Sequence, residues 1–192
     1  MPDTEPPVLT VRATVAAVVL TVPVLTELFV ASVGDAAVGH LVFAVSQAVG
    51  WSLLASVARA ASPAPGRAAR TGRVLVLVGC ALQVGFAAVY GVTALDAEPL
   101  EASFVLFLLG FLAVTVGGVT WAVPLLRGGG ALAGGGLLAV AVLGLLTVLV
   151  GQDPFHDVFL LTSYAAWVLA ARGLQGRDVG QSLTPARYGD PV

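Results

Sequence analysis

Charged residues are scarce in this sequence, and their scarcity excludes most classes of soluble protein. Asp, Glu, Lys and Arg together make up 10% of the 192 residues, whereas they make up roughly a quarter of an ordinary water-soluble domain. Hydrophobic residues make up 58%. Secreted proteins, nucleic-acid-binding proteins and cytosolic enzymes are therefore excluded, and the composition predicts an integral membrane protein.

Lysine, asparagine and isoleucine are absent, so all nine basic residues are arginine. The codons of the three missing residues are rich in A and T, and their absence is typical of a GC-rich genome. This bias favours a bacterial source, with the bacterial plasma membrane as the location.

Cysteine is almost absent, and the motifs of thiol and metal chemistry are missing. Cys80 is the single cysteine, so the chain cannot form an internal disulfide. No CxxC, HExxH or GxSxG sequence occurs, and no glycine-rich loop is followed by Lys-Ser or Lys-Thr. The sequence therefore indicates no catalytic motif of a known type.

Six apolar runs are long enough to cross a bilayer as helices. A hydrocarbon core of about 30 Å needs roughly 20 helical residues at 1.5 Å each. Turn-forming residues separate the runs, and continuous runs of this length favour helices over barrel strands. We predict an all-α bundle of six transmembrane helices at residues 13–33, 36–58, 73–95, 102–126, 131–151 and 155–172.

Basic and acidic residues separate between the connections, and this predicts the orientation. Arginines precede the first run, occupy the second and fourth connections and follow the sixth run, whereas the charged residues of the odd-numbered connections are acidic. By the positive-inside rule both termini are cytoplasmic. Trp51, Trp121 and Trp167 lie toward the arginine-flanked ends of their runs, which predicts an interfacial aromatic belt.

A cleaved signal peptide is the competing interpretation of the first run, with the small residues around Ala31 as the processing site. The run is long, contains Pro23 and Glu27 and has no basic cluster ahead of it, so a retained helix is favoured. Cleavage would leave five spans in the same orientation.

The second and sixth runs share a pattern that includes both histidines. The segments HLVFAVSQAVGW and HDVFLLTSYAAW both fit H-x-V-F-x-x-[ST]-x-x-x-x-W. The match reflects either duplication of a helix pair or chance, since the fourth run holds no third copy. On a helix the shared spacing places the histidine, a polar residue and the tryptophan on one face. The two faces comprise His40, Gln47 and Trp51, and His156, Ser163 and Trp167.

Glu27 lies inside a predicted span, near the outer surface. A charge near the middle of a membrane helix costs about 2.5–3.5 kcal/mol, so Glu27 is expected to face protein or water. His40 and His156 lie toward the same surface. The hypotheses are a structural clasp between Glu27 and His40, a proton-exchanging cluster, or a ligand set of all three side chains for a divalent metal such as Zn²⁺. The sequence identifies no cofactor, and a divalent metal is a candidate for this cluster.

Polar residues also recur at an interval of seven along the third run. Gln83 and Tyr90 share a face of the predicted helix. Together with Gln47 and Ser163 they either line a polar cleft that opens outward or hydrogen-bond between helices, for about 1 kcal/mol each.

The second connection and the C-terminal tail suggest partners on the cytoplasmic side. Anionic lipid head groups are the expected contacts of its four arginines, although the topology rule alone also explains their charge. The tail, residues 173–192, is rich in Gly, Gln, Ser and Pro and is predicted to be disordered. A second copy of the chain or another membrane protein is a further candidate partner. The four arginines are Arg59, Arg67, Arg70 and Arg73.

The sequence therefore predicts a non-enzymatic membrane protein that binds or transports an ion or a small solute. The predicted site is an outward-facing cluster around Glu27 and the two histidines. The alternative is a membrane-embedded metal-dependent enzyme or redox protein with Glu27, His40 and His156 as ligands. A structural subunit of a membrane complex is a third hypothesis.

Overall fold

The computed structural model describes residues 8–33, 36–62, 66–93, 101–150 and 154–182. Within these ranges it does not describe the side chains of residues 26–33, 36–37, 93, 101–102, 154–156 and 177–182. Every regular element in the described ranges is an α-helix. The helices are α1 (Val8–Val33), α2 (Ala36–Ala60), α3 (Arg67–Thr93), α4 (Glu101–Arg127), α5 (Ala131–Val150) and α6 (Pro154–Ser182).

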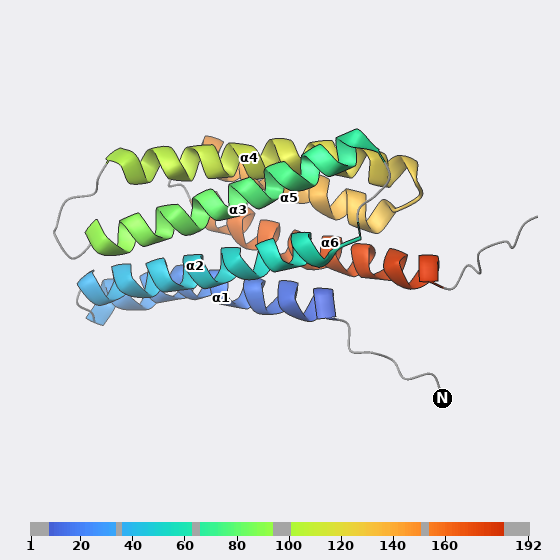
Figure 1. Ribbon diagram of the computed structural model, residues 1–192. Helices are drawn as coiled ribbons and strands as arrows, with labels where there is room; N and C mark the ends of the chain where they lie inside the picture. The colour runs from blue at the N-terminus through green and yellow to red at the C-terminus, as the bar shows by residue number, and fades with distance from the viewer. Residues whose placement is uncertain (1–7, 34–35, 63–65, 94–100, 151–153, 183–192) are drawn as a thin grey trace, which may run out of the picture.

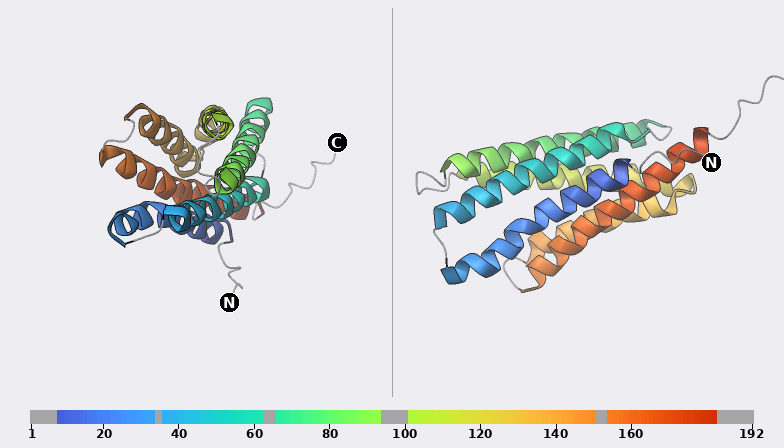
Figure 2. Two further views of the ribbon diagram at one scale, coloured as in Figure 1. Left: turned by 90° about the vertical axis from the view of Figure 1, so that its left-hand side faces the viewer. Right: turned by 90° about the horizontal axis from the view of Figure 1, so that it is seen from below.

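The six helices form a closed ring in chain order. Each helix packs against the next one along the chain, and α6 packs against α1. Neighbouring helices run antiparallel (Figure 1). One end of the bundle therefore holds the beginning of α1, the end of α6, and the connections from α2 to α3 and from α4 to α5. Viewed along its axis, the bundle shows the helices arranged around an interior (Figure 2, left). The arginines with described side chains belong to this end of the bundle, which we call the arginine end.

Five of the six helices are long and apolar enough to cross a membrane. The helix α6 does not meet that standard within its described residues, which include Asp157 and Arg172. The predicted all-α, multi-pass character is therefore confirmed, whereas a sixth span stays a prediction. The five apolar stretches are Val8–Leu25, Val38–Ala60, Arg67–Val92, Ser103–Arg127 and Ala131–Val150.

The outer surface of the ring is apolar. Val18, Val92 and Leu149, on three different helices, are 61, 64 and 70% exposed. Soluble monomers rarely expose contiguous apolar patches larger than a few hundred Å². A surface of this kind is expected of helices that stand in lipid.

The interior holds the tryptophans that were predicted for the membrane interface. Trp51, Trp121 and Trp167 are 8, 0 and 2% exposed and belong to the apolar core. The predicted aromatic belt is wrong for these residues, because belt tryptophans stand on the outer surface at the level of the head groups. Among the described residues, nothing accepts a hydrogen bond from the Trp121 indole N–H.

Glycines allow α3 and α4 to pack backbone against backbone. A Cβ atom at Gly79 would lie 2.7 Å from the carbonyl oxygen of Gly110, and one at Gly117 would lie 2.8 Å from that of Gly72. Side chains do not fit at such distances, so a larger residue at either position would push the two helices apart.

Two helices extend beyond the predicted spans at the arginine end. The helix α3 begins at Arg67 and not at residue 73, and α6 continues to Ser182, through the first half of the predicted tail. Tertiary contacts hold this extension of α6. Leu174 is buried, and the Gln175 Oε1 accepts hydrogen bonds from the N–H and hydroxyl of Thr10 at 3.2 and 3.0 Å. Residues 173–182 therefore differ from the predicted disorder.

Candidate functional site

A cavity of about 220 Å³ lies inside the ring, which we call the interior cavity. Side chains from α2, α3, α4, α5 and α6 line it, whereas none of the described residues of α1 does. The lining positions fall near the middle of their helices, as Gln47 does in α2 and Gln83 in α3. Four of the five helices that line the interior cavity, α2 to α5, contain apolar stretches that can cross a membrane, and α6 supplies the rest of the wall.

Gln47 is a buried residue of α2 that joins two aromatic residues of the cavity wall. Its Oε1 accepts a hydrogen bond from the indole N–H of Trp51 at 2.9 Å. Its side chain is also hydrogen-bonded to the hydroxyl of Tyr164 on α6. Because a glutamine amide has a separate donor and acceptor end, two such partners fix its orientation. The amide thereby ties α2 to α6 beside the interior cavity.

Gln83 is a buried residue of α3 whose side chain reaches α4. Its Nε2 donates to the backbone carbonyl of Phe107 at 3.1 Å. No described residue donates a hydrogen bond to the Gln83 Oε1. Since an amide oxygen has two lone pairs, Gln83 gives the cavity wall a hydrogen-bond acceptor.

Two hydroxyl groups on the wall, those of Ser163 and Thr147, donate their hydrogens to their own helices. The Ser163 Oγ donates to the carbonyl of Leu160 at 2.7 Å, and the Thr147 Oγ1 donates to that of Leu143 at 2.9 Å. A hydroxyl that donates in this way keeps lone pairs on its oxygen. Ser163 therefore adds a second acceptor to the wall, contributed by α6.

Aromatic rings make up much of the remaining wall. Ring centroids are 6.2 Å apart between Phe43 and Phe86, 5.4 Å between Phe86 and Phe107, and 6.1 Å between Phe107 and Phe111. These separations fall in the range of about 4.5–7 Å in which aromatic pairs attract each other. The rings thus form a connected apolar surface across three helices.

Three of the predicted binding residues line the interior cavity, and two others with described side chains, Tyr90 and His40, do not. Gln47, Gln83 and Ser163 all line the interior cavity. Tyr90 is not among its lining residues, and its ring meets the edge of His40 at a centroid distance of 5.5 Å. His40 is exposed and lies in the first turns of α2, away from the arginine end.

Of the three predicted metal ligands, His40 is the one whose side chain the structure describes. Glu27 and His156 lie outside the described side chains. Among the side chains that are described, no three of His, Cys, Asp or Glu form a group that could hold a metal ion.

Sequence reasoning missed Tyr164, Thr147 and the phenylalanines of the wall. A signal was present in the pattern shared by the second and sixth runs. Its polar and tryptophan positions in both helices line the same cavity, so the two patterned faces meet inside the ring. The periodicity identified each face, but it did not show that the faces oppose each other.

The arginines predicted to contact lipid differ in their environment. Arg59, Arg67 and Arg70 are exposed. The Arg73 guanidinium donates instead to two backbone carbonyls at the end of α2, from Nε to Ala58 at 2.7 Å and from a terminal nitrogen to Arg59. Arg73 therefore caps a helix, because the last carbonyls of a helix lack partners within it.

Comparisons with models of protein families, with curated proteins and with solved structures find no match to this chain.

Proposed function

We propose that this chain is a multi-pass membrane protein that binds a small, uncharged solute in the interior cavity. One observation carries the proposal: Gln47, Gln83 and Ser163, from three different helices, share one mostly apolar cavity. An apolar wall with a few polar groups is the usual composition of a small-molecule site. The polar groups would orient the solute, and the aromatic rings would hold its apolar part.

The chemistry of the wall favours a neutral solute over an ion. The described lining residues include no Asp, Glu, Lys, Arg or His. An ion moved into such a place without a partner loses several kcal/mol of hydration energy. From the sequence we expected an ion or a small solute, and the proposal keeps only an uncharged solute. It also places the site in the interior cavity and not at Glu27 and the histidines.

The size of the interior cavity limits the solute further. An engineered apolar cavity of about 150 Å³ in another protein holds benzene. A volume of about 220 Å³ therefore suits a single ring with one small substituent. A hydroxyl on that ring would donate its hydrogen to the Gln83 Oε1.

Three probes of similar size test this proposal: phenol, toluene and benzoate. Binding to the purified full-length chain in detergent is measured by ligand-observed NMR, with tryptophan fluorescence as a second readout because Trp51 and Trp167 line the interior cavity. We expect phenol to bind about fivefold more tightly than toluene, which corresponds to one net hydrogen bond of about 1 kcal/mol. Benzoate is expected not to bind.

A matched pair of glutamine variants gives the control. Gln83→Leu removes the acceptor at nearly constant volume, so phenol and toluene should then bind equally. Gln175→Leu removes a glutamine that is bonded to Thr10 outside the interior cavity, so the preference for phenol should remain. Equal binding of phenol and toluene by the unaltered chain, or tight binding of benzoate, would contradict the proposal.

We further infer that α6 is a sixth span and that both termini are cytoplasmic. In support, α6 packs against both α5 and α1 and buries Trp167, so the ring would be open without it. The positive-inside rule assigns the arginine end, where α1 begins and α6 ends, to the cytoplasm. The absence of Lys, Asn and Ile supports the plasma membrane of a bacterium as the location.

A further inference from the structure

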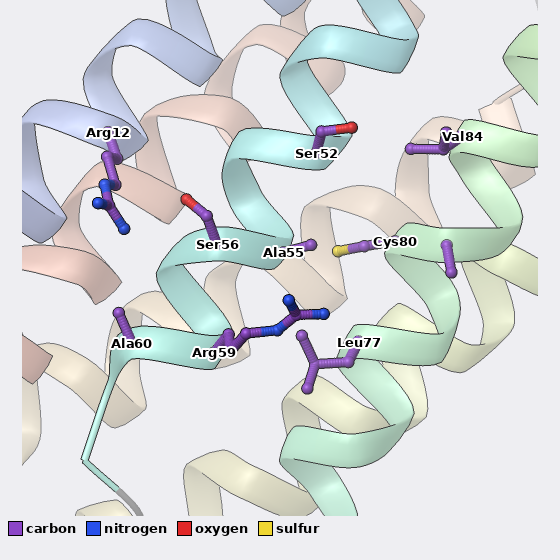
Figure 3. A pocket seen from close by; sticks show the side chains of 10 residues that line it. Arg12, Ser52, Ala55, Ser56, Arg59, Ala60, Leu77, Cys80 and Val84 are labelled. Atoms are coloured by element: carbon purple, nitrogen blue, oxygen red, sulfur yellow. The ribbon is translucent and has the colours of Figure 1, made fainter.

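A second cavity, of about 500 Å³, opens on the outside of the ring. It lies over α2 between α1 and α3 and shares no lining residue with the interior cavity. Figure 3 shows the Arg12 side chain reaching from α1 toward α2, and the Arg59 side chain reaching from α2 toward α3. We call this cavity the arginine groove, lined among others by Arg12, Ser52, Arg59, Leu77, Ala81 and Val84.

The two guanidinium groups of the arginine groove have no described counter-charge. Arg12 and Arg59 are both exposed. Asp157 is the one acidic residue whose side chain the structure describes, and it lies in the first turn of α6, away from the arginine end. Two positive charges that face one groove favour an anion there, and guanidinium groups bind phosphate through paired N–H donors.

The polarity of the arginine groove changes along its length. Arg73 bonds to the carbonyls of Ala58 and Arg59, so it marks the level of the arginine end on α3. Leu77, Ala81 and Val84 follow on the same helix. At 1.5 Å per residue, Val84 lies about 16 Å beyond Arg73 toward the middle of the bundle. The groove is therefore cationic at its end and apolar at depth.

The arginine groove continues into the lipid-facing surface. Val49 on α2 and Val78 on α3, which are close in sequence to its lining residues, are 44 and 46% exposed. A ligand that fills the groove would thus have a negative head at the arginine end and an apolar chain along the helices. That order of polarity is the order found in an anionic phospholipid standing in its own leaflet.

We propose that the arginine groove binds one anionic phospholipid of the surrounding bilayer. Arg12 and Arg59 flank the anionic head group from the two sides of α2, and an acyl chain lies along Leu77, Ala81 and Val84. The site differs from the general attraction of basic loops to acidic membranes, because it has a defined volume and binds the lipid in a groove formed by three helices. It does not depend on solute binding in the interior cavity.

Lipid retention by the full-length chain tests the proposal. The protein is purified in detergent, supplied with equal amounts of phosphatidylglycerol and phosphatidylcholine, and examined by native mass spectrometry. We expect one phosphatidylglycerol to be retained, with a preference of roughly 30-fold that reflects two arginines. The double variant Arg12→Gln, Arg59→Gln should lose this preference, whereas the control Arg127→Gln, Arg172→Gln, which changes two exposed arginines at the same end, should keep it.

Two further arms identify the source of the phosphate and guard against misfolding. Ala81→Trp fills the apolar part of the arginine groove and leaves both arginines in place, so it should lower retention of the lipid. Free inorganic phosphate should not displace the lipid from the unaltered chain. Displacement by phosphate, equal retention of the two lipids, or loss of preference in the control variant would overturn the proposal.

Discussion

The Arg73 side chain belongs to α3 but completes α2. The last carbonyls of a helix have no N–H donors within it, and a cation there also interacts favourably with the helix dipole. The Arg73 guanidinium supplies both the N–H donors and the positive charge, through its bonds to the carbonyls of Ala58 and Arg59. One side chain thereby fixes the end of one helix to the beginning of the next.

Arg73→Gln removes these charge-assisted bonds and should lower the free energy of unfolding by about 1 kcal/mol. Thermal unfolding of the purified protein in detergent measures the change. Arg70→Gln, in the same turn region but exposed, is the control and should change stability by less than about 0.5 kcal/mol. If both variants unfold at the same temperature, the cap contributes no stability.

At the scale of helices, the contact between α3 and α4 depends on the absence of side chains. Gly79 and Gly110 face each other so closely that the backbones touch. Without a hydrophobic force between helices in lipid, close packing of this kind is a main source of association. Gly85 lies on the same helix α3, but a Cβ atom added there would have no neighbouring atom within 4 Å.

Gly79→Ala and Gly85→Ala separate the packing role of glycine from its effect on helix propensity. At Gly79 the new methyl group meets the α4 backbone, so we expect a loss of about 1–3 kcal/mol. At Gly85 the methyl group meets open space, so stability should stay constant or rise by up to about 1 kcal/mol. Unfolding temperatures of the two variants in the same detergent check this. A similar loss in both would argue against tight packing at Gly79.

The helices were predictable and their ends and faces were less so, for a physical reason. Hydrophobicity over about 20 residues is a local property, so the sequence located α1 to α5 as apolar helices. The extension of α6 depends on Leu174 and Gln175 meeting other helices, and nothing local reports those contacts. The tryptophans were misplaced because nearness to arginine in the sequence says nothing about which side of a helix they occupy.

The candidate site was predictable in its polar residues and not in its location. Helical spacing placed Gln47 and Trp51 on one face and identified Gln83 and Ser163 as polar positions inside apolar helices. Their meeting in one cavity depends on the ring order of the helices, which arises from packing between distant parts of the chain. The same spacing also placed His40 on the face of Gln47 and Trp51, although the His40 side chain is exposed and does not line the interior cavity.

At the scale of the whole molecule, the separation of charge between the two ends predicts the topology. In a variant with Cys80→Ala, single cysteines are introduced by Ala68→Cys, Glu98→Cys or Val192→Cys. A membrane-impermeant maleimide should label Glu98→Cys on intact cells, and the other two only after permeabilisation, because the positive-inside rule predicts that the arginine end faces the cytoplasm. Labelling of Ala68→Cys on intact cells would show that the orientation is the opposite one. Labelling of Val192→Cys on intact cells, with Ala68→Cys still protected, would exclude α6 as a span.

The closure of the ring by α6 also sets the order in which the interior cavity is completed. The chain is synthesised from its N-terminus, so Gln47 and Gln83 are made before Ser163 and Tyr164. Before α6 is made, the amide of Gln47 lacks its partner Tyr164, and the interior cavity lacks the wall that α6 provides. The last helix therefore closes the ring and completes the wall of the interior cavity, so a chain truncated before α6 would leave this cavity open on one side.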